Sequence, residues 1–159
     1  MVSDPKFRII SGGQTGADRA ALDAAIAHGV DYGGWCPKGG WAEDASNPPG
    51  VLARYPNLAE TPSPDPQQRT EWNARDSDGT LVFLPPNARS PGTAFTVECA
   101  KRLGKELLIV DPHAPDAARS IRDWLAAQKI RILNIGGPRE SEAPSIYIAV
   151  LKILTALLQ

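Results

Sequence analysis

Apolar positions along this chain follow two alternating patterns. Short apolar runs, typical of strands buried on both faces of a sheet, are followed by stretches in which apolar residues return at helical spacing. Leu22, Ala25 and Ile26 have this helical spacing, and Gly29 ends the stretch. The strands predicted in this way are 7–11, 30–34, 80–84, 107–110 and 131–135. The predicted helices are 17–28, 93–103, 116–128 and 144–158.

The alternation of strands and helices predicts the fold class. Strands that are joined through helices pair in parallel by right-handed crossovers, and the helices then cover the sheet. We therefore expect an α/β, Rossmann-like parallel sheet of about five strands with helices on both faces. Residues 1–159 are enough for a single Rossmann-like ligand-binding domain. The helix at 144–158 has more apolar residues than one sheet-facing stripe needs, so we also expect a homo-oligomer.

One segment interrupts the alternation. Residues 35–66 have neither a helical nor a strand period, and they hold nearly half of the fifteen prolines. Loops longer than about 12–15 residues are uncommon in compact domains and are usually functional or disordered. We expect an ordered, irregular, Pro-rich flap at the ligand site, anchored by Trp35, Trp41 and Tyr55. A surface insertion without a role in binding is the alternative.

Charge and composition limit the class of partner. Seventeen Lys and Arg residues and eighteen Asp and Glu residues leave a net charge of -1, without a basic stripe, so a nucleic-acid partner is not expected. Residues 1–8 show no apolar signal region, and no apolar run has the length of a membrane span. The two cysteines give no disulfide framework. A cytoplasmic protein with a small-molecule partner is the resulting expectation.

A glycine-rich junction follows the first predicted strand. It is formed by Gly12, Gly13, Gln14, Thr15 and Gly16. In a parallel α/β sheet the ligand crevice lies beyond the carboxyl ends of the strands. A helix that starts there on glycine offers its backbone N–H groups and its dipole to an anion, typically a phosphate. The junction therefore predicts a phosphate site, and a tight turn that binds nothing is the alternative.

The junction fits neither of two common nucleotide motifs. GGQTG lacks the Lys of the P-loop, and its adjacent glycines do not match GxGxxG. The acidic residue expected about 20 residues later for a ribose is also missing, so a classical NAD enzyme is not expected.

Three other predicted strands are followed by similar residues. These are Lys38 and Gly39, Gly92 and Thr93, and Arg139 and Ser141. Because the carboxyl ends of parallel strands share one edge of the sheet, we expect all four loops to converge on one anion. The alternatives are a solvated Lys38, a helix cap at Ser90 or Thr93, and a surface ion pair at Arg139. Arg69 and Asp18 are further candidates, Arg69 for a ligand contact and Asp18 for a hydroxyl contact or a cap.

Groups for catalysis or metal binding are scarce. His28 and His113 are isolated, and no paired cysteines or HxxxH spacing occur. A lowered pKa is conceivable for Cys36 beside Lys38, and a buried, inert thiol is the alternative. No catalytic residue and no metal ligand is therefore predicted, and the expectation leans against an enzyme.

Five motifs in this order resemble the molybdenum cofactor carrier family over nearly the whole chain. They are SGGQTGADRAALDAA, GGWCPKGGWAED, RTEWNARDSDGTL, GTAFTVECA and LNIGGPRESE. The resemblance implies a Rossmann-like fold, oligomerisation, and a carrier or storage protein that binds molybdenum cofactor (molybdopterin) through its phosphate and metal end. A molybdoenzyme is the recipient that it implies.

The resemblance also marks two departures and leaves two alternatives open. The family is related to the lysine-decarboxylase-like phosphoribohydrolases, which carry P-G-G-x-G-T-x-x-E. Here Thr96 stands at the place of that glutamate, and Glu98 follows two residues later. Gly40 stands where the carrier family has a basic residue. The alternatives are a phosphoribohydrolase that uses Glu98 or Asp18 on nucleoside monophosphates, and a nucleotide-sensing module.

Overall fold

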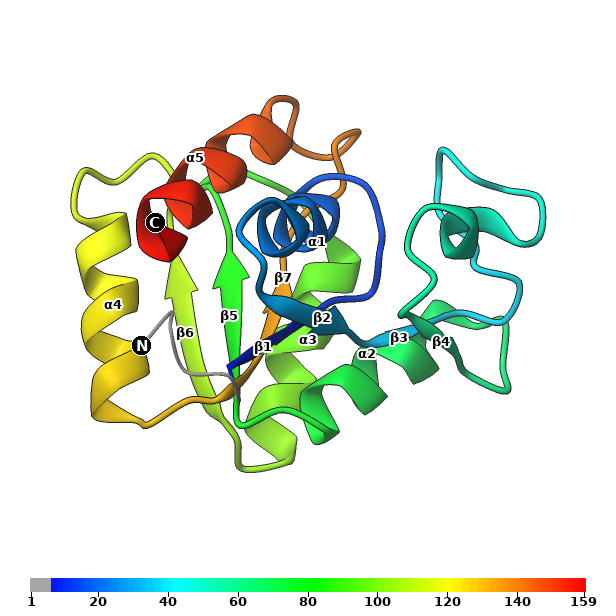
Figure 1. Ribbon diagram of the computed structural model, residues 1–159, viewed down its shortest axis with the longest axis horizontal. Helices are drawn as coiled ribbons and strands as arrows, with labels where there is room; N and C mark the ends of the chain where they lie inside the picture. The colour runs from blue at the N-terminus through cyan, green and yellow to red at the C-terminus, as the bar shows by residue number, and fades with distance from the viewer. Residues whose placement is uncertain (1–6) are drawn as a thin grey trace.

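The central sheet confirms the predicted fold class. The computed structural model describes residues 7–159, and the first six residues, where no signal region is expected, lie outside the described part. Its five strands are all parallel, as the register of each neighbouring pair shows. Their spatial order is β2 (Asp31–Gly33), β1 (Arg8–Ile10), β7 (Ile132–Gly136), β5 (Gly79–Phe83) and β6 (Glu106–Val110) (Figure 1).

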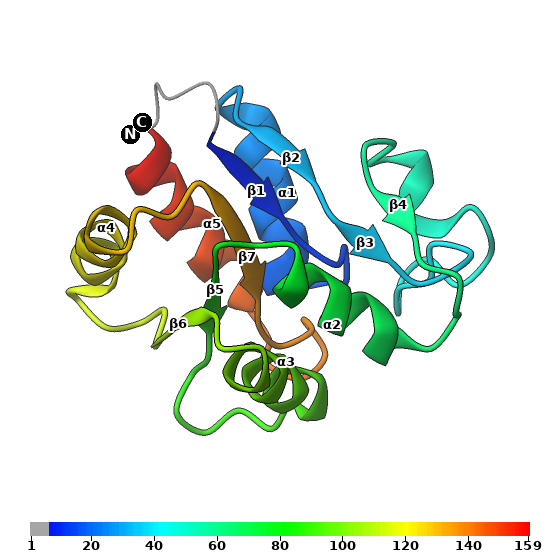
Figure 2. The same ribbon diagram turned by 90° about the horizontal axis from the view of Figure 1, so that it is seen from below.

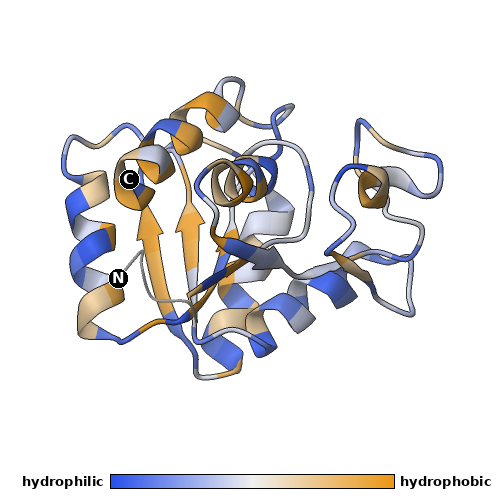
Figure 3. Ribbon diagram, in the orientation of Figure 1, coloured by the Kyte–Doolittle hydropathy of each residue, from blue (hydrophilic) through white to orange (hydrophobic). Residues whose placement is uncertain are grey.

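Helices cover both faces of this sheet, as expected. They are α1 (Ala17–Ala27), α2 (Pro66–Arg75), α3 (Pro91–Arg102), α4 (Ala117–Ala127) and α5 (Ile146–Leu158). Helices α1 and α4 both contact α5 on one face, and α2 contacts α3 on the other (Figure 2). In Figure 3 most of α5 is hydrophobic, whereas α2 is mostly hydrophilic.

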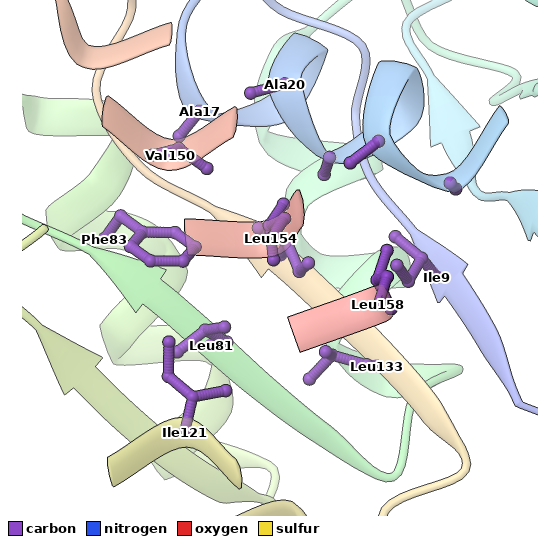
Figure 4. Close-up of a cluster of buried hydrophobic side chains, with 14 of the residues drawn as sticks. Ile9, Ala17, Ala20, Leu81, Phe83, Ile121, Leu133, Val150, Leu154 and Leu158 are labelled. Atoms are coloured by element: carbon purple, nitrogen blue, oxygen red, sulfur yellow. The ribbon is translucent and has the colours of Figure 1, made fainter. Parts of the chain in front are cut away.

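The last strand of the chain occupies the middle of the sheet. Strand β7 pairs with β1 on one side and with β5 on the other. If β7 is counted as the first strand and the rest follow in chain order, the spatial order reads 3-2-1-4-5, which is the start of the doubly wound Rossmann order. The end of α5 lies beside β1, where Leu158 packs near Ile9 (Figure 4). The architecture is therefore a doubly wound sheet whose chain begins at the second strand.

The core between the sheet and helices α1, α4 and α5 is packed from small and large residues. Its fully buried large side chains include Ile9, Leu81, Phe83, Leu133 and Leu154 (Figure 4). Helix α1 contributes mainly alanines, namely Ala17, Ala20, Ala21, Ala24 and Ala25. Such small side chains let a helix approach the sheet and its neighbour closely, and α1 and α5 lie side by side in both ribbon views (Figures 1 and 2).

The segment at 35–66 has a small core of its own. It contains β3 (Trp35–Cys36), the 3-10 helix η1 (Gly50–Ala53) and β4 (Ala59–Glu60). Strands β3 and β4 form a two-stranded parallel sheet that the sequence pattern did not predict. Val51, Tyr55 and Leu58 pack there against Leu22 of α1. The rings of Trp35 and Trp72 meet edge to face at 4.8 Å, which ties the segment to α2.

Within residues 7–159, no helix has the length and apolar character that a membrane crossing requires.

Candidate functional site

A cavity of about 190 Å³ lies at the carboxyl ends of β1, β5 and β7. Its position is the crevice at which doubly wound sheets bind ligands. Loops after three strands contribute to it, together with α2 and the first turns of α1 and α3. The lining residues are Gly12, Gln14, Asp18, Pro66, Gln67, Arg69, Thr70, Asn73, Ser90, Pro91, Gly92, Thr93, Phe95, Thr96, Asn134, Ile135, Gly136, Gly137, Arg139 and Glu142.

The structure brings part of the predicted site together in this cavity. Of the residues predicted to bind the phosphate, the cavity is lined by Gly12, Gln14, Gly92, Thr93 and Arg139. They come from three of the four loops that were expected to converge. Asp18 and Arg69 also line the cavity, whereas the other predicted residues lie outside the lining, in three different environments, namely Gly13, Thr15, Gly16, Lys38, Gly39 and Ser141.

Lys38 and Gly39 lie on the flap at 35–66. The Lys38 side chain is exposed, and the Gly39 N–H donates to Glu60 Oε1 at 2.7 Å. The flap contributes only its last residue, Pro66, to the cavity lining. Its effect on the cavity must therefore pass through neighbouring residues.

Gly13 and Gly16 are packing positions. A Cβ on Gly13 would meet Leu58 Cδ1 at 3.1 Å, so the absence of a side chain here lets the apolar cluster of the flap pack against this loop. Gly16 has φ 81, and a Cβ there would clash with the carbonyl oxygen of Pro138. The N–H of Ala17 donates to the same carbonyl at 3.3 Å. The loop between β7 and α5 thus covers the N-terminus of α1, the helix end at which the sequence predicted a phosphate.

Thr15 and Ser141 meet at a carboxylate of the flap, Glu43. Thr15 Oγ1 donates to Glu43 Oε2, and Ser141 Oγ donates to Glu43 Oε1 at 2.6 Å. Arg139 Nη1 lies 4.0 Å from the same Oε1. Burial alone raises the pKa of Glu43, but the hydrogen bonds from Ser141 and Thr15 outweigh it and hold the pKa below its usual range. We call this arrangement the Glu43 clasp.

Gln14 carries a hydrogen-bond donor without a partner at the cavity. Its Oε1 accepts the N–H groups of Thr15 at 3.0 Å and of Glu43 at 2.9 Å. These two bonds fix the orientation of the amide, because only the oxygen can accept. The Nε2 group is buried and has no hydrogen-bond partner within residues 7–159. A buried donor left unpaired costs about 1–3 kcal/mol, so this position favours an acceptor on a ligand.

Asp18 and Arg69 place opposite charges in the cavity. Asp18 Oδ2 accepts the N–H of Gln14 at 3.3 Å, and Arg69 Nη1 donates to the Gly12 carbonyl at 2.8 Å. Burial raises the pKa of Asp18 to about 6, although the nearby Arg69 guanidinium opposes the rise. Burial also lowers the pKa of Arg69 from its usual value. Asp18 is therefore mostly ionised at neutral pH and protonates in mild acid.

The N-terminus of α3 opens at the cavity. Ser90 is its N-cap and accepts the Thr93 N–H at 3.4 Å, while the Ser90 hydroxyl donates to Glu142 Oε1 at 2.8 Å. Gly92 has open space where a side chain would be. Pro91 has no N–H, and the N–H groups of Thr93 and Ala94 donate to Ser90. The Gly92 N–H and the helix dipole are therefore what this helix end offers to an anion.

Glu98, a candidate catalytic carboxylate, lies outside the cavity lining. Its side chain is 66% exposed and lies 4.0 Å from Arg102 Nη1. Thr96 lines the cavity instead, and its hydroxyl donates to the Gly92 carbonyl at 3.0 Å. The carboxylates that line the cavity are Asp18 and Glu142.

Cys36 does not behave as a reactive thiolate. It is buried, and burial raises its pKa to about 11, so the alternative of a lowered pKa is wrong. In the described part of the chain, no group of three or more His, Cys, Asp and Glu side chains could hold a metal ion.

Several lining residues were missed by sequence reasoning. Asn73 lies on α2, whereas Asn134, Gly136 and Gly137 lie at or just after the end of β7. The central position of β7 in the sheet would have pointed to the three residues at its end, because a central strand ends at the crevice. Local patterns carry no information about that position.

Comparisons with known proteins agree with this architecture. A family model described as the circularly permutated YpsA SLOG family matches residues 9–158. The crystal structure named "Putative molybdenum carrier protein", from Syntrophus aciditrophicus SB, is similar with a TM-score of 0.86 and 43% sequence identity, covering 96% of this chain and 94% of that chain. No curated protein matches this chain.

Proposed function

The chain belongs to the circularly permutated YpsA SLOG family, and on this premise we propose that it binds and protects a phosphorylated pterin-type ligand. Molybdenum cofactor is the first candidate, and the protein acts as its carrier or storage form. The observation that carries the proposal is the meeting, in one cavity, of the open α3 N-terminus with the unpaired Gln14 donor. The carrier name of the similar crystal structure supports the choice of ligand.

The phosphate of the ligand binds at the start of α3. Pro91 has no N–H and the Thr93 N–H is held by Ser90, so the Gly92 N–H is the neutral donor of this turn, and Arg139 supplies a positive charge on the opposite loop. The Arg139 guanidinium lies over the Trp41 ring at 5.4 Å and near Glu43, so it is already oriented by the flap. The flap at 35–66 therefore acts on the site through Arg139 and Gln14.

The ligand leaves this site chemically unchanged. A hydrolase would need a carboxylate placed to act on the bound ligand, and Glu98 points into solvent. Asp18 is the cavity carboxylate with a raised pKa, so a phosphoribohydrolase activity would depend on it. We treat this activity as the second candidate.

Gly92 allows a test of phosphate binding that does not disturb the fold. Gly92→Asp fits the open space, and its carboxylate suits a helix N-terminus, so folding is retained while a phosphate is repelled. Gly92→Ala is the matched control. We expect isolated molybdenum cofactor to bind the wild type and Gly92→Ala at micromolar concentration, and to bind Gly92→Asp at least about tenfold more weakly. No binding to the wild type would overturn the proposal.

The same samples separate the carrier from the alternatives. Recovered cofactor should be intact and able to activate a cofactor-free molybdoenzyme, which is the proposed recipient. Nucleoside monophosphates should give no free base. Release of base that is lost in Asp18→Asn would instead identify a hydrolase, and nucleotide binding without reaction would identify a sensor.

We also propose that the protein is a homo-oligomer that buries the outer face of α5. Ile148 on this helix is 52% exposed, and Leu151, three positions later on the same side, is partly exposed. The particle mass measured by light scattering should exceed that of one chain, and Ile148→Glu should lower it. A single-chain mass for the wild type would contradict this assembly.

A further inference from the structure

The proposed function leaves open how the heterocycle of the ligand is recognised, and this inference rests on that function. Gly136 at the end of β7 leaves a gap beside Asp18 in the cavity. A Cβ at Gly136 would lie 3.9 Å from Asp18 Oδ1 and 3.6 Å from Thr96 Cγ2. The gap therefore separates the first turn of α1 from α3, and it borders the same cavity as the α3 N-terminus.

Gln14 and Asp18 form a donor and acceptor pair next to this gap. The two residues are joined by the hydrogen bond from the Gln14 N–H to Asp18 Oδ2. The Gln14 side chain has its free Nε2 group, since Oε1 is held by Thr15 and Glu43. Asp18 offers carboxylate oxygens that only accept. The two side chains thus bring an unpaired neutral donor and a carboxylate acceptor to the lining of one cavity.

This pair is complementary to one kind of heterocyclic edge. A ring that carries a carbonyl oxygen, a ring N–H and an exocyclic amino group in a row presents one acceptor followed by two donors. The carboxylate can accept the N–H and the amino group through its two oxygens, and the carboxamide can donate to the carbonyl. Pterins have this edge as their 2-amino-4-oxo pyrimidine ring, and guanine has the same edge.

We propose that Gln14 and Asp18 bind the 2-amino-4-oxo edge of the ligand and so select pterin-type or guanine-type heterocycles. Adenine-type rings and 2,4-dioxo rings lack the two adjacent donors that the Asp18 carboxylate would accept. A dioxo ring brings a carbonyl oxygen against the carboxylate, which is repulsive and leaves the carbonyl unpaired. Selection by a buried carboxylate also explains why the chain keeps a charge in a phosphate-binding cavity, where it costs affinity for the anion.

The charged surroundings are compatible with this role. Arg69, Arg19 and Arg139 all favour the ionised form of Asp18, and burial opposes it. Arg69 is held by the Gly12 carbonyl, and Arg19 binds Asp44 at 2.8 Å. These partners hold both guanidinium groups, and the Asp18 carboxylate remains on the cavity wall.

A pair of phosphate-free probes tests the inference in the wild-type protein. We use 6-hydroxymethylpterin and 6-hydroxymethyl-lumazine, which differ in having an amino group or a carbonyl at position 2. Dissociation constants at pH 7 are expected to favour the pterin on the order of tenfold or more, because hydrogen bonds to a charged group are at stake. Equal affinity for the two probes would overturn the inference without the use of any variant.

Asp18→Asn provides the second measurement. The Asn amide can donate to the lumazine carbonyl and accept from its ring N–H, so the preference for the pterin should disappear or reverse. Circular dichroism and urea unfolding check that the variant is folded. A folded Asp18→Asn protein that still prefers the pterin tenfold would show that Asp18 is only structural.

Guanosine and inosine 5′-monophosphates separate the two sources of the edge. They differ in the same 2-amino group, so a preference for the guanosine compound supports edge recognition in a nucleotide. Binding of the pterin alone supports a pterin ligand.

Failure of this inference and failure of the proposed function are distinguishable. Cofactor binding that Gly92→Asp weakens, without discrimination between pterin and lumazine, would overturn only the inference. Discrimination without cofactor binding would overturn the carrier.

Discussion

At the residue scale, Asp18 is a buried carboxyl group whose effect on stability changes with pH. It is buried beside Gln14 and Arg69 at the cavity, and burial raises its pKa to about 6 from 3.8. A folded-state pKa above the unfolded value means that the neutral form is the favoured one in the folded protein. The stability from this group is therefore fully present below about pH 4 and is lost as the pH rises through about 6.

We predict that Asp18→Asn stabilises the protein at neutral pH. The neutral amide avoids the burial of a charge, and the gain at pH 7.5 should be on the order of 1–3 kcal/mol. At pH 4 the carboxyl is already neutral in the folded protein, so the gain should nearly vanish. Urea unfolding at both pH values measures this, with the exposed Asp123→Asn as control. A variant less stable than the wild type at pH 7.5 would mean that attraction to Arg69 exceeds the burial cost.

At the scale of elements, the flap at 35–66 is held to the sheet domain by several polar contacts, among them the ion pair of Arg19 with Asp44 and two further groups. One is the Glu43 clasp, which joins the flap to the loops after β1 and β7. The other is Asp23 of α1, which accepts the hydroxyl of Tyr55 from the flap and of Tyr147 from α5, each at 2.5 Å. Because η1 and the short strands β3 and β4 bury few residues, these polar contacts matter more to the flap than to the sheet.

We predict that Glu43→Gln loosens the flap locally. The neutral amide keeps one accepting oxygen for the hydroxyls of Thr15 and Ser141 and loses the charge assistance, which should cost about 1–2 kcal/mol. Hydrogen exchange should become faster across residues 39–50 and stay unchanged in β5 and β7. The exposed Glu106→Gln serves as the control. Unchanged exchange across the flap would show that the Arg19–Asp44 ion pair, Asp23 and the apolar cluster hold it without the clasp.

At the scale of the whole molecule, the sheet order explains how a chain that begins at the second strand still folds. The helix α5 follows β7 and ends next to β1, which pairs with β7 in parallel. A β7–α5–β1 crossover is therefore present in space although the chain is open between α5 and β1. Domains tolerate such permutation because their termini lie at the surface and often close together.

We predict that a chain rearranged to begin with β7, followed by α5 and β1, will fold. Residue 159 would be joined to residue 7 by a Gly/Ser linker of about six residues, and the chain opened between the exposed residues Gln128 and Lys129. The new chain should unfold cooperatively, with a midpoint within about 10 °C of the wild type. Thermal unfolding followed by circular dichroism measures this. A chain opened within β7, between Asn134 and Ile135, is the matched control and should not fold. Failure of the first variant would contradict the strand order.

The sequence by itself determined the kind of most elements. Alternating apolar runs and helical spacing predicted the five central strands, four of the five helices and the parallel α/β class, because element type depends on neighbours within a few positions. The glycine junction and the residues Gly92, Thr93 and Arg139 were recognisable for the same reason. The short strands β3 and β4 were missed, since two-residue strands have no period to detect.

Only the tertiary structure decided which strand ends meet, and whether the polar groups of a loop bind a carboxylate of the chain or line a cavity. The central place of β7 depends on pairings between residues more than a hundred positions apart, such as Ile9 with Leu133, and local hydrophobicity does not encode them. In the same way, the hydroxyls of Thr15 and Ser141 and the charge of Arg139 suit any anion. The fold brings them Glu43 from within the chain, whereas the α3 N-terminus and Gln14 line a cavity. A donor pattern in a sequence specifies the chemistry of its partner, whereas the packing of distant segments decides whether that partner is internal or a ligand.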